Sequence, residues 1–436
     1  MQRRGGLVGR ALCGVALGAL ITAPVHAAGF SIFEQGSRAM GMAGAFTAQA
    51  DDPSLLFHNV GGLGFVEEQE FSAGFTWIHG LEAEFQGANP FPGEGYEAEQ
   101  KALSEFPPHI YWVRPINDTW KFGLGVMTPF GLTTEWEDPD QFAGRYISTK
   151  AALQSFDIQP TLGWQVTESF SVGFGAIARI STLELNRYIP AVNPFTLRVA
   201  DVGRVAIEGD FSEGYGFTAG VLHRVNNSFS WGFNYRSKIE IDYEGDGRVT
   251  QVLTGTPFDQ VIGTVIPFNR DLPVETSIEF PDSASLGLAF ALSPSLRLET
   301  DFNWTGWSTF DEVPITFTGG PGNALPSSVL PEEWEDVWNY RAGLRWIRSS
   351  TSEWRFGYVF DETPQPEAGV SPLLPDADRN GFTLGYGRTG PGFNYDLALM
   401  YLDFKERTRD ESFDEEGPFF GTYNTQAVLV GVTLNL

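Results

Sequence analysis

From residue 69 onward, apolar and polar residues alternate along much of the chain. In SLRLETDFNW (295–304), one set of alternate positions carries Leu296, Leu298, Thr300, Phe302 and Trp304. The other set carries Arg297, Glu299, Asp301 and Asn303. Successive side chains of a strand point to opposite faces, so this period of two predicts a strand with one apolar and one polar face.

The same alternation recurs in 229–236, 285–292, 338–346 and 428–436, and many of the polar faces mix charged residues with glycine. The apolar faces would suit either the core of a soluble sandwich or the lipid around a membrane barrel. The barrel interpretation places Arg297, Arg341 and Arg345 in a lumen and the many aromatic residues at lipid interfaces.

The alternating segments divide the chain into fourteen predicted antiparallel strands, which makes the fold all-β. They are 69–80, 106–116, 119–131, 150–166, 169–186, 208–225, 228–243, 277–292, 295–310, 336–348, 352–361, 379–388, 392–404 and 421–436.

The connections between these strands are of two kinds. Six are short and rich in Asn, Asp, Gly, Pro or Ser, which favour tight turns: 116–119, 167–169, 225–228, 292–295, 348–352 and 388–392. The other seven are long and alternate with them: 81–105, 132–149, 187–207, 244–276, 311–335, 362–378 and 405–420. Outer-membrane barrels of Gram-negative bacteria have an even strand number, short periplasmic turns and long extracellular loops, so both termini are expected in the periplasm.

A secretory leader is predicted over residues 1–27. Arg3, Arg4 and Arg10 precede a short apolar stretch, Pro24 ends it, and Val25–Ala27 supplies small residues for cleavage. The apolar stretch is far shorter than the roughly 20 residues of a membrane-spanning helix. The chain's one cysteine, Cys13, lies in this leader, so the mature protein is expected to have no disulfide and no cysteine-bound metal.

The charge of the chain excludes binding to nucleic acid through phosphate contacts. The chain has 28 basic and 55 acidic residues, and removal of the three leader arginines leaves 25 against 55, a net charge of −30. Aromatic residues make up 14% of the chain, yet no mature segment approaches a membrane-spanning helix. A secreted chain of this composition is typical of an outer-membrane β-barrel.

The segment before the first strand, AGFSIFEQGSRAMGMAGAFTAQADDPSLLFHNVGGLGF (28–65), has too many small residues for a core helix and no alternation. A disordered tail would be less apolar than this segment. Its apolar residues include Phe30, Ile32, Phe33, Leu55, Leu56 and Phe57.

Several blocks of the sequence, in order, resemble the FadL-type outer-membrane transporters of long-chain fatty acids and other hydrophobic compounds. They are AGFSIFEQGSRAMGMAGAFTAQADDPSLLFHN (28–59), PFGLTTEWEDPDQFAGRY (129–146), NYRSKIEIDYEGD (234–246), PDSASLGLAF (281–290), WTGWSTFDE (304–312) and LPDADR (374–379). The resemblance implies a 14-stranded transmembrane barrel whose lumen is closed by an N-terminal hatch. The expected divisions are a leader (1–27), a hatch (28–68) and a barrel (69–436).

Two positions depart from the pattern of this family. Its members usually carry Asn-Pro-Ala near the end of the hatch, whereas here Asn59 is followed by Val60 and Gly61. These three residues are predicted to form the hatch turn and to take part in gating. Loss of the proline frees the backbone, and Gly61 and Gly62 are expected to keep the turn. The chain also ends in Leu436 where such barrels often end in Phe.

The family resemblance also suggests ligand contacts. Phe30 resembles the hatch phenylalanine at the inner end of the ligand pocket, and Arg179 and Arg187 lie where the family places basic residues against a head group. By strand parity Arg179 and Arg187 share the lumen face of 169–186 and its continuation. The alternatives are hatch packing for Phe30 and, for Arg179, pairing with acids on neighbouring strands such as Glu299 or Asp301.

No catalytic pattern or cofactor motif stands out, and the chain is predicted not to be an enzyme. The five histidines have no ligand spacing, and GYGFTAG (214–220) fits small residues on alternate strand positions. DADRNG (376–381) begins like a calcium loop, but Gly387 stands where the loop needs Glu, so a polar loop is expected. Acid clusters at 332–336 and 410–416 are interpreted as solvated loops, or as sites bridged by cations to lipid phosphates.

The predicted function is passive uptake of a hydrophobic compound (a fatty acid, alkane or aromatic hydrocarbon) across the outer membrane by a monomer in contact with outer-membrane lipid and lipopolysaccharide. Release is expected through a hatch rearrangement or sideways through the wall. A general diffusion porin, a surface adhesin or structural barrel, and a membrane hydrolase are the alternatives. A porin would require an open lumen. An adhesin would carry its activity in the acidic loops, and a hydrolase would require a lipid-facing Ser-His pair.

Overall fold

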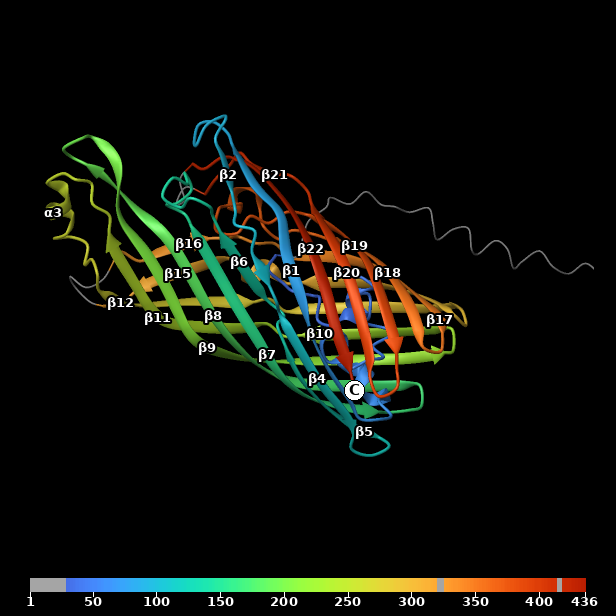
Figure 1. Cartoon of the computed structure of the whole chain (residues 1–436). Helices are drawn as coiled ribbons and strands as arrows, with labels where there is room; N and C mark the ends of the chain where they lie inside the picture. The colour runs from blue at the N-terminus through green and yellow to red at the C-terminus, as the bar shows by residue number, and fades with distance from the viewer. Residues whose placement is uncertain (1–28, 320–324, 414–417) are drawn as a thin grey trace, which may run out of the picture.

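The barrel closes on itself between the ends of the chain. The computed structural model describes residues 29–319, 325–413 and 418–436. The first strand, β1 (Glu70–Gly87), pairs antiparallel with the last, β22 (Gly421–Asn435), from Ser72↔Asn435 to Gly87↔Gly421 (Figure 1). The predicted leader and acidic residues 414–416 lie outside the described residues. No helix in the described part of the chain has the length and apolarity needed to cross a membrane.

Between these two strands the chain runs up and down, and each span pairs antiparallel with its neighbours. The spans are β4 (Pro108–Pro115), β5 (Trp120–Met127), β7 (Lys150–Gln165), β8 (Phe170–Asn193), β9 (Arg198–Asn226), β10 (Phe229–Arg236) with β11 (Ile239–Gln251), β12 (Asp271–Phe280) with β13 (Ser283–Ser293), β14 (Leu296–Thr305), β17 (Val337–Ser349), β18 (Ser352–Asp361), β19 (Arg379–Thr389) and β20 (Asn394–Phe404). The prediction of a 14-stranded antiparallel barrel is confirmed.

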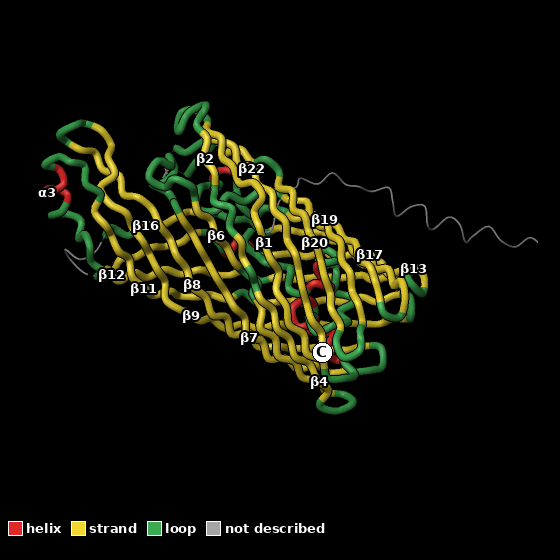
Figure 2. The backbone as a smooth tube through the Cα atoms, in the orientation of Figure 1, coloured by secondary structure: helices red, strands yellow, loops and turns green. Residues whose placement is uncertain are grey.

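Shorter elements lie in the connections at one end of the barrel, which is here called the long-loop end. They are β2 (Glu97–Glu99), β3 (Ser104–Glu105), β6 (Gly131–Glu135), α3 (Phe258–Ile262), η2 (Trp307–Thr309), β15 (Glu312–Phe317), β16 (Ser328–Pro331), η3 (Glu367–Gly369) and β21 (Arg407–Arg409). The tight turns join the spans at the opposite end, the short-turn end (Figure 2).

The structure differs from the predicted strands in two ways. The predicted loop 187–207 is mostly ladder, since β8 and β9 pair as far as Asn193↔Arg198. These outer ends stay paired, with register shifts at Ser181/Leu183 and Ile189/Pro190, and their inner faces bury an apolar cluster that includes Val205, Ile207 and Val274. Several predicted strands are also interrupted. The chain between β12 and β13 breaks at Pro281, which has no backbone N–H for the ladder.

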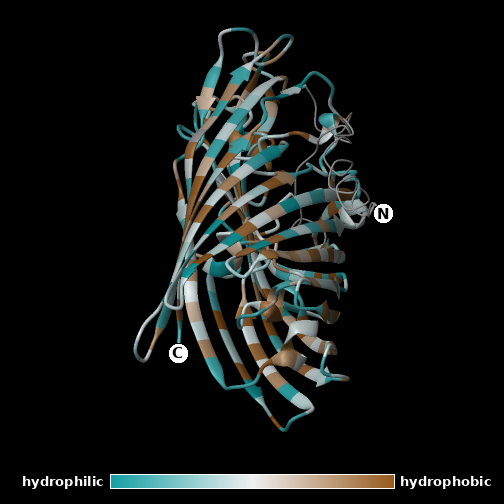
Figure 3. Cartoon of the chain, turned by 90° about the vertical axis from the view of Figure 1, so that its right-hand side faces the viewer, coloured by the Kyte–Doolittle hydropathy of each residue, from teal (hydrophilic) through white to brown (hydrophobic). Residues whose placement is uncertain are grey.

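Hydrophobic and hydrophilic residues alternate along the strands of the wall, as the banding in Figure 3 shows. Phe174 on β8 and Trp338 on β17 are 57% and 46% exposed on the outer face. On the inner face, the charged side chain of Arg341 is only 3% exposed. Charged groups are therefore buried inside the protein while large apolar groups face outward, which is the arrangement of a membrane barrel.

The N-terminal segment lies inside this barrel (Figure 2). Here it is called the hatch (residues 29–66). It contains three short helical turns, α1 (Ser37–Met40), α2 (Leu55–His58) and η1 (Val60–Phe65), and most of its side chains are buried. Because these turns are too short to be stable alone, the hatch depends on its contacts with the wall.

Those contacts are made possible by a ring of inward-facing glycines on the wall strands, here called the glycine collar. A Cβ atom at Gly173 would lie 2.1 Å from the Val60 carbonyl oxygen, and one at Gly232 would lie 2.2 Å from that of Thr47. Only glycine permits so close an approach of two backbones. The collar consists of Gly123, Gly163, Gly173, Gly220, Gly232, Gly287, Gly343, Gly357, Gly385 and Gly431.

Two buried carboxylates interrupt the collar and bind the hatch backbone. Asp301 accepts hydrogen bonds from the N–H groups of Phe46 and Thr47, both at 3.0 Å. Glu299 accepts from the Ala48 N–H and, at 2.8 Å, from the Gln49 side chain. These contacts satisfy backbone donors that have no partner within the hatch.

Candidate ligand-binding site

An apolar pocket, here called the upper pocket, lies between the hatch and the long-loop end of the barrel. Its free volume is about 100 Å³. Its lining is almost entirely aliphatic and aromatic, with Glu184, Thr276 and Glu332 as the polar members: Phe30, Leu132, Ala151, Ala152, Leu153, Leu183, Glu184, Leu185, Ile207, Val274, Thr276, Ile278, Phe310, Val313, Ile315, Leu330, Glu332, Leu373 and Leu374. Such a surface matches the hydrocarbon part of a ligand.

Phe30 of the hatch forms the floor of this pocket. Its ring is surrounded by aromatic side chains from distant parts of the sequence, and it is 5% exposed. The distances between ring centroids are 4.7 Å to Trp307, 5.4 Å to Phe310, 5.6 Å to Trp334, 6.0 Å to Phe130 and 6.2 Å to Phe280. The edge-on arrangement of most of these pairs is favourable for aromatic rings.

Backbone contacts fix Phe30 in this position. The Ile32 N–H donates to the Pro129 carbonyl at 2.8 Å, and the Gly131 N–H donates to the Phe30 carbonyl at 3.1 Å. The Gly29 N–H donates to the Asp376 carboxylate at 3.2 Å. The start of the hatch is therefore held to an interruption in the barrel wall, the segment 128–130 between β5 and β6.

This interruption borders a second cavity, here called the wall pocket, of about 430 Å³. The ladder between β4 and β5 ends at Ile110↔Val126, the Thr128 hydroxyl donates to the Pro108 carbonyl at 2.8 Å, and the next backbone bridge is Gln100↔Trp136. The wall pocket occupies this region. It shares four lining residues with the upper pocket: Phe30, Leu132, Leu153 and Leu374.

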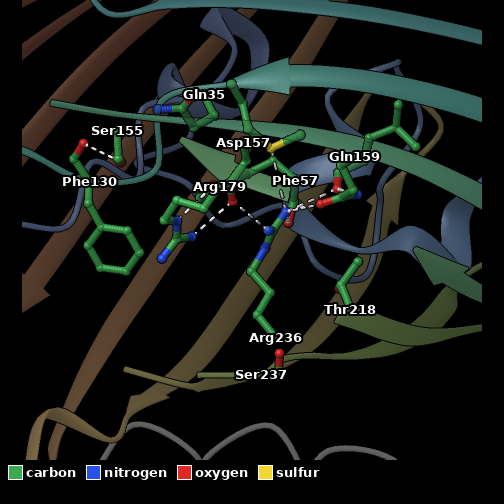
Figure 4. Close-up of polar contacts among 12 residues, drawn as sticks. Gln35, Phe57, Phe130, Ser155, Asp157, Gln159, Arg179, Thr218, Arg236 and Ser237 are labelled. Atoms are coloured by element: carbon green, nitrogen blue, oxygen red, sulfur yellow. Dashed lines mark hydrogen bonds and ion pairs between the residues drawn. The ribbon is translucent and has the colours of Figure 1, made fainter. Parts of the chain in front are cut away.

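Arg179 lies below the floor and does not line the upper pocket. Its Nε and Nη2 donate to the Asp157 carboxylate at 2.7 and 2.9 Å, and Asp157 is directly opposite it on β7 (Figure 4). The rings of Phe130 and Phe280 cover its guanidinium at 4.6 and 4.8 Å. The sequence suggested Glu299 or Asp301 as partners, but those acids bind the hatch.

Arg187 also lies outside the upper pocket. It is on the outer part of β8, where its Nη2 donates to the Ser328 hydroxyl at 3.4 Å. Neither predicted head-group arginine therefore reaches the apolar lining. The acids that do, Glu184 and Glu332, are engaged: Lys150 contacts Glu184 at 2.6 Å, and the Trp334 indole donates to Glu332 at 3.0 Å.

Asn59, Val60 and Gly61 are fixed between the hatch and the wall. The Asn59 amide donates to the carbonyls of Thr47 and Val221 at 2.7 and 3.0 Å and accepts from the Gly61 N–H at 2.9 Å. The Val60 N–H donates to Asn234 at 3.2 Å, and the Gly61 carbonyl accepts from Ser171. The Asn59 side chain thus connects this turn to both the hatch and the wall.

The loop that begins like a calcium site uses its acids for protein contacts. Asp376 accepts from the Thr363 hydroxyl at 2.6 Å as well as from Gly29, and Asp378 pairs with Lys405 at 3.2 Å. The expectation of a polar loop agrees with these contacts.

Sequence reasoning missed most of the upper pocket. On β8 the inward positions change from Ser171, Gly173 and Gly175 to Leu183 and Leu185 towards the long-loop end. This change from small to aliphatic residues at alternate positions of one strand was the feature of the sequence that could have indicated the pocket. The gathering of five aromatic rings around Phe30 left no such signal, since these residues are spread over the chain.

Comparison with known proteins gives a consistent picture. A family model described as outer membrane protein transport protein (OMPP1/FadL/TodX) matches residues 18–436. A long-chain fatty acid transport protein of Escherichia coli O6:H1 is 24% identical over 407 residues, covering 87% of each chain. A 47 kDa outer membrane protein of Pasteurella multocida is 26% identical over 429 residues, covering 96% of each chain.

Solved structures show the same fold. A Pseudomonas aeruginosa FadL homologue superimposes with a TM-score of 0.81 at 20% identity, covering 94% of this chain and 99% of that one. The Ralstonia pickettii toluene transporter TbuX gives a TM-score of 0.68 at 16% identity, covering 92% and 99%.

Proposed function

Because the chain belongs to the outer membrane protein transport protein family (OMPP1/FadL/TodX), we propose that it carries hydrophobic compounds passively across the outer membrane. The upper pocket is the binding site in this proposal, and Phe30 is its floor and a ligand contact. The observation that carries the proposal is an apolar cavity inside a barrel, closed below by one aromatic side chain of the hatch.

The substrate we propose is uncharged where it meets the upper pocket. Relatives are named for long-chain fatty acids and for toluene. The pocket lining contains no Lys or Arg among the described residues, and it includes Glu184 and Glu332. A carboxylate would meet no cation there and would lose its hydration, so an alkane, an aromatic hydrocarbon or the tail of a fatty acid fits better. Arg179 and Arg187 then act in the wall and the outer loops, not as head-group ligands.

The exit route we propose runs sideways through the wall pocket. The two pockets share Phe30, so movement of this side chain would join them. The glycine collar holds the body of the hatch, including Asn59, Val60 and Gly61, against the wall. Movement is therefore confined to residues 29–35, with Gly36 (φ +144°) as the hinge, and the ligand leaves into the bilayer without the hatch being withdrawn.

The test is to block the wall pocket while leaving the upper pocket open. In Ala83→Trp, a large side chain fills the wall pocket from β1. We expect binding of a radiolabelled alkane to purified protein to persist and its uptake into cells to fall at least tenfold. The matched control is Glu84→Trp, since the adjacent side chain is exposed and points the other way. Unchanged uptake in Ala83→Trp would exclude this route.

The remaining features of the proposal concern the cell. The leader 1–27 directs export, both termini lie in the periplasm, and the monomer sits in the outer membrane of a Gram-negative bacterium among lipid and lipopolysaccharide. We expect no catalysis. The general diffusion porin and the surface adhesin or structural barrel remain the competing functions. Bilayer conductance tests the porin, and loop deletion with uptake retained argues against the adhesin.

A further inference from the structure

A small cavity with a mixed polar and apolar lining lies under the floor of the upper pocket, between the hatch and the wall. Its free volume is about 60 Å³. Four arginines from four different strands line it, and it is here called the arginine cavity. Its arginines are Arg179 on β8, Arg236 on β10, Arg341 on β17 and Arg379 on β19. Asn234, Ser237, Ser283, Ser285, Thr305 and Asn339 add hydroxyl and amide groups, and no Asp or Glu is in the lining.

The positive charge of these arginines is only partly neutralised by the acids behind them. Asp157 is shared between Arg179, at 2.7 Å, and Arg236, at 3.7 Å (Figure 4). Asp361 is shared between Arg341, at 3.4 Å, and Arg379, at 3.1 Å. Two carboxylates therefore face four guanidinium groups in direct contact.

Two further acids are near Arg379 on the side of the wall pocket. They are Glu34 of the hatch, which also interacts with Arg341, and Asp376. Burial raises the pKa of both carboxyl groups, and the nearby arginines oppose that shift. Neither is part of the cavity lining.

Several donors that face the arginine cavity have no hydrogen-bond partner in the described protein. They include Nε and Nη1 of Arg236. Both ring nitrogens of His58, whose side chain is 3% exposed, also lack a partner, and one of them carries the N–H donor of a neutral imidazole. Arg236 is otherwise held in place, since its Nη2 donates to Gln159 at 2.8 Å and to the Leu56 carbonyl at 3.2 Å. Buried donors of this kind are costly unless something accepts from them.

We propose that the arginine cavity binds one small monovalent anion, a halide or a carboxylate group, between His58 of the hatch and Arg236 and Arg341 of the wall. Water would satisfy the donors, but it would leave the excess charge uncompensated in a buried site. The free volume admits a few water-sized groups. Access is through the wall pocket, which shares Ser31, Ile32, Phe130 and Arg379 with it.

Such an anion bridges the hatch to the barrel. Its oxygen or halide would accept from groups on both bodies, so its binding stabilises the closed position of α2. This role is independent of which compound enters the upper pocket, and the two sites can be tested separately.

The direct test is diffraction from crystals of the full-length mature protein grown in sodium bromide. We expect an anomalous peak within hydrogen-bond distance of Arg236 Nη1 and a ring nitrogen of His58. A second crystal set contains acetate, and a third contains dodecanoate, each with bromide. Displacement by acetate assigns the site to free small anions, and displacement by dodecanoate alone assigns it to a substrate head group. Bromide only at surface positions overturns the proposal.

Two variants connect the peak to these residues. His58→Phe keeps the ring and removes both nitrogens, and Arg236→Gln removes the charge. We expect at least a fivefold loss of bromide occupancy in each, while Arg187→Gln, which changes an arginine outside the cavity, retains it. Heat-modified migration on gels checks that each barrel has folded. Hydrocarbon binding in the upper pocket should remain in all three variants. If the unaltered protein binds bromide in the arginine cavity but no hydrocarbon, that result counts against the transport proposal and leaves the anion proposal standing.

Discussion

The ring of Phe30 lies 4.7 Å from the indole of Trp307, centroid to centroid, at an interplanar angle of 66°. This contact joins the first described residues of the hatch to the 3-10 turn that follows β14. It closes the floor of the upper pocket, since both rings belong to the apolar cluster that also contains Phe310 and Trp334.

Replacement of Phe30 by Ala should open this floor. We expect hydrocarbon affinity to fall at least tenfold, which corresponds to about 1.4 kcal/mol, because the ligand loses an aromatic wall and the pocket gains a path downward. Tryptophan fluorescence quenching by a brominated alkane measures the affinity. Phe174→Ala is the matched control, as Phe174 is 57% exposed on the outer face. Equal affinities in the two variants would place the binding site elsewhere.

Filling the glycine collar should displace the hatch. Gly173→Val puts a branched side chain where even a Cβ would lie 2.1 Å from the Val60 carbonyl oxygen, so the hatch backbone must shift. We expect ion conductance in planar bilayers to rise well above the low level of the unaltered protein. Gly80→Val on β1 is the control, because no atom lies within 4 Å of a Cβ at that position. High conductance in the unaltered protein would instead favour the porin.

The lack of a cation in the upper pocket predicts a preference for uncharged ligands. Dodecane or dodecanol should bind more tightly than dodecanoate at pH 8, by at least tenfold. Leu183→Lys should reverse the order, since an ammonium group would then face the ligand, whereas Leu183→Met should leave it unchanged. Competition against one fluorescent hydrocarbon measures the affinities of these ligands for the unaltered protein and for both variants. Dodecanoate binding as strong as dodecanol binding to the unaltered protein would contradict this prediction.

The Arg179–Asp157 pair should behave as a buried ion pair. Asp157→Asn leaves the guanidinium uncompensated and is expected to lower the free energy of unfolding by about 3–5 kcal/mol. Combining Asp157→Leu with Arg179→Met should recover only part of this loss, because Arg236, which lies 3.7 Å from the same carboxylate, still loses its partner. Urea unfolding in detergent micelles, followed by tryptophan fluorescence, gives the values. A double variant as unstable as the single one would show that the pair has a further role.

Much of the wall could be predicted from the sequence because its pattern is local. The alternation in 295–304 fixes which side chains of β14 face inward, and the turn residues at 225–228 fix where β9 and β10 reverse. The glycines among the polar positions were also visible. The role of these glycines could not be predicted, because a glycine collar is recognisable only when the hatch backbone is seen to lie against it.

The outer loops and the interruptions were harder to predict. Pro190 and Asn193 resemble loop residues, yet β8 continues through them because its ladder with β9 continues. The interruption at 128–130 is stabilised by hydrogen bonds to the start of the hatch, nearly one hundred residues earlier in the chain. Such pairings between distant segments leave no local trace.

The sequence by itself determined the strand count, the two faces of the wall and the presence of an apolar N-terminal segment, because strand geometry depends on neighbouring residues alone. Only the tertiary structure decided that Arg179 is neutralised by Asp157, that six distant aromatic rings form one floor, and that four arginines surround one small cavity. Each of these depends on distances across a closed barrel, and closure is a property of all its strands together.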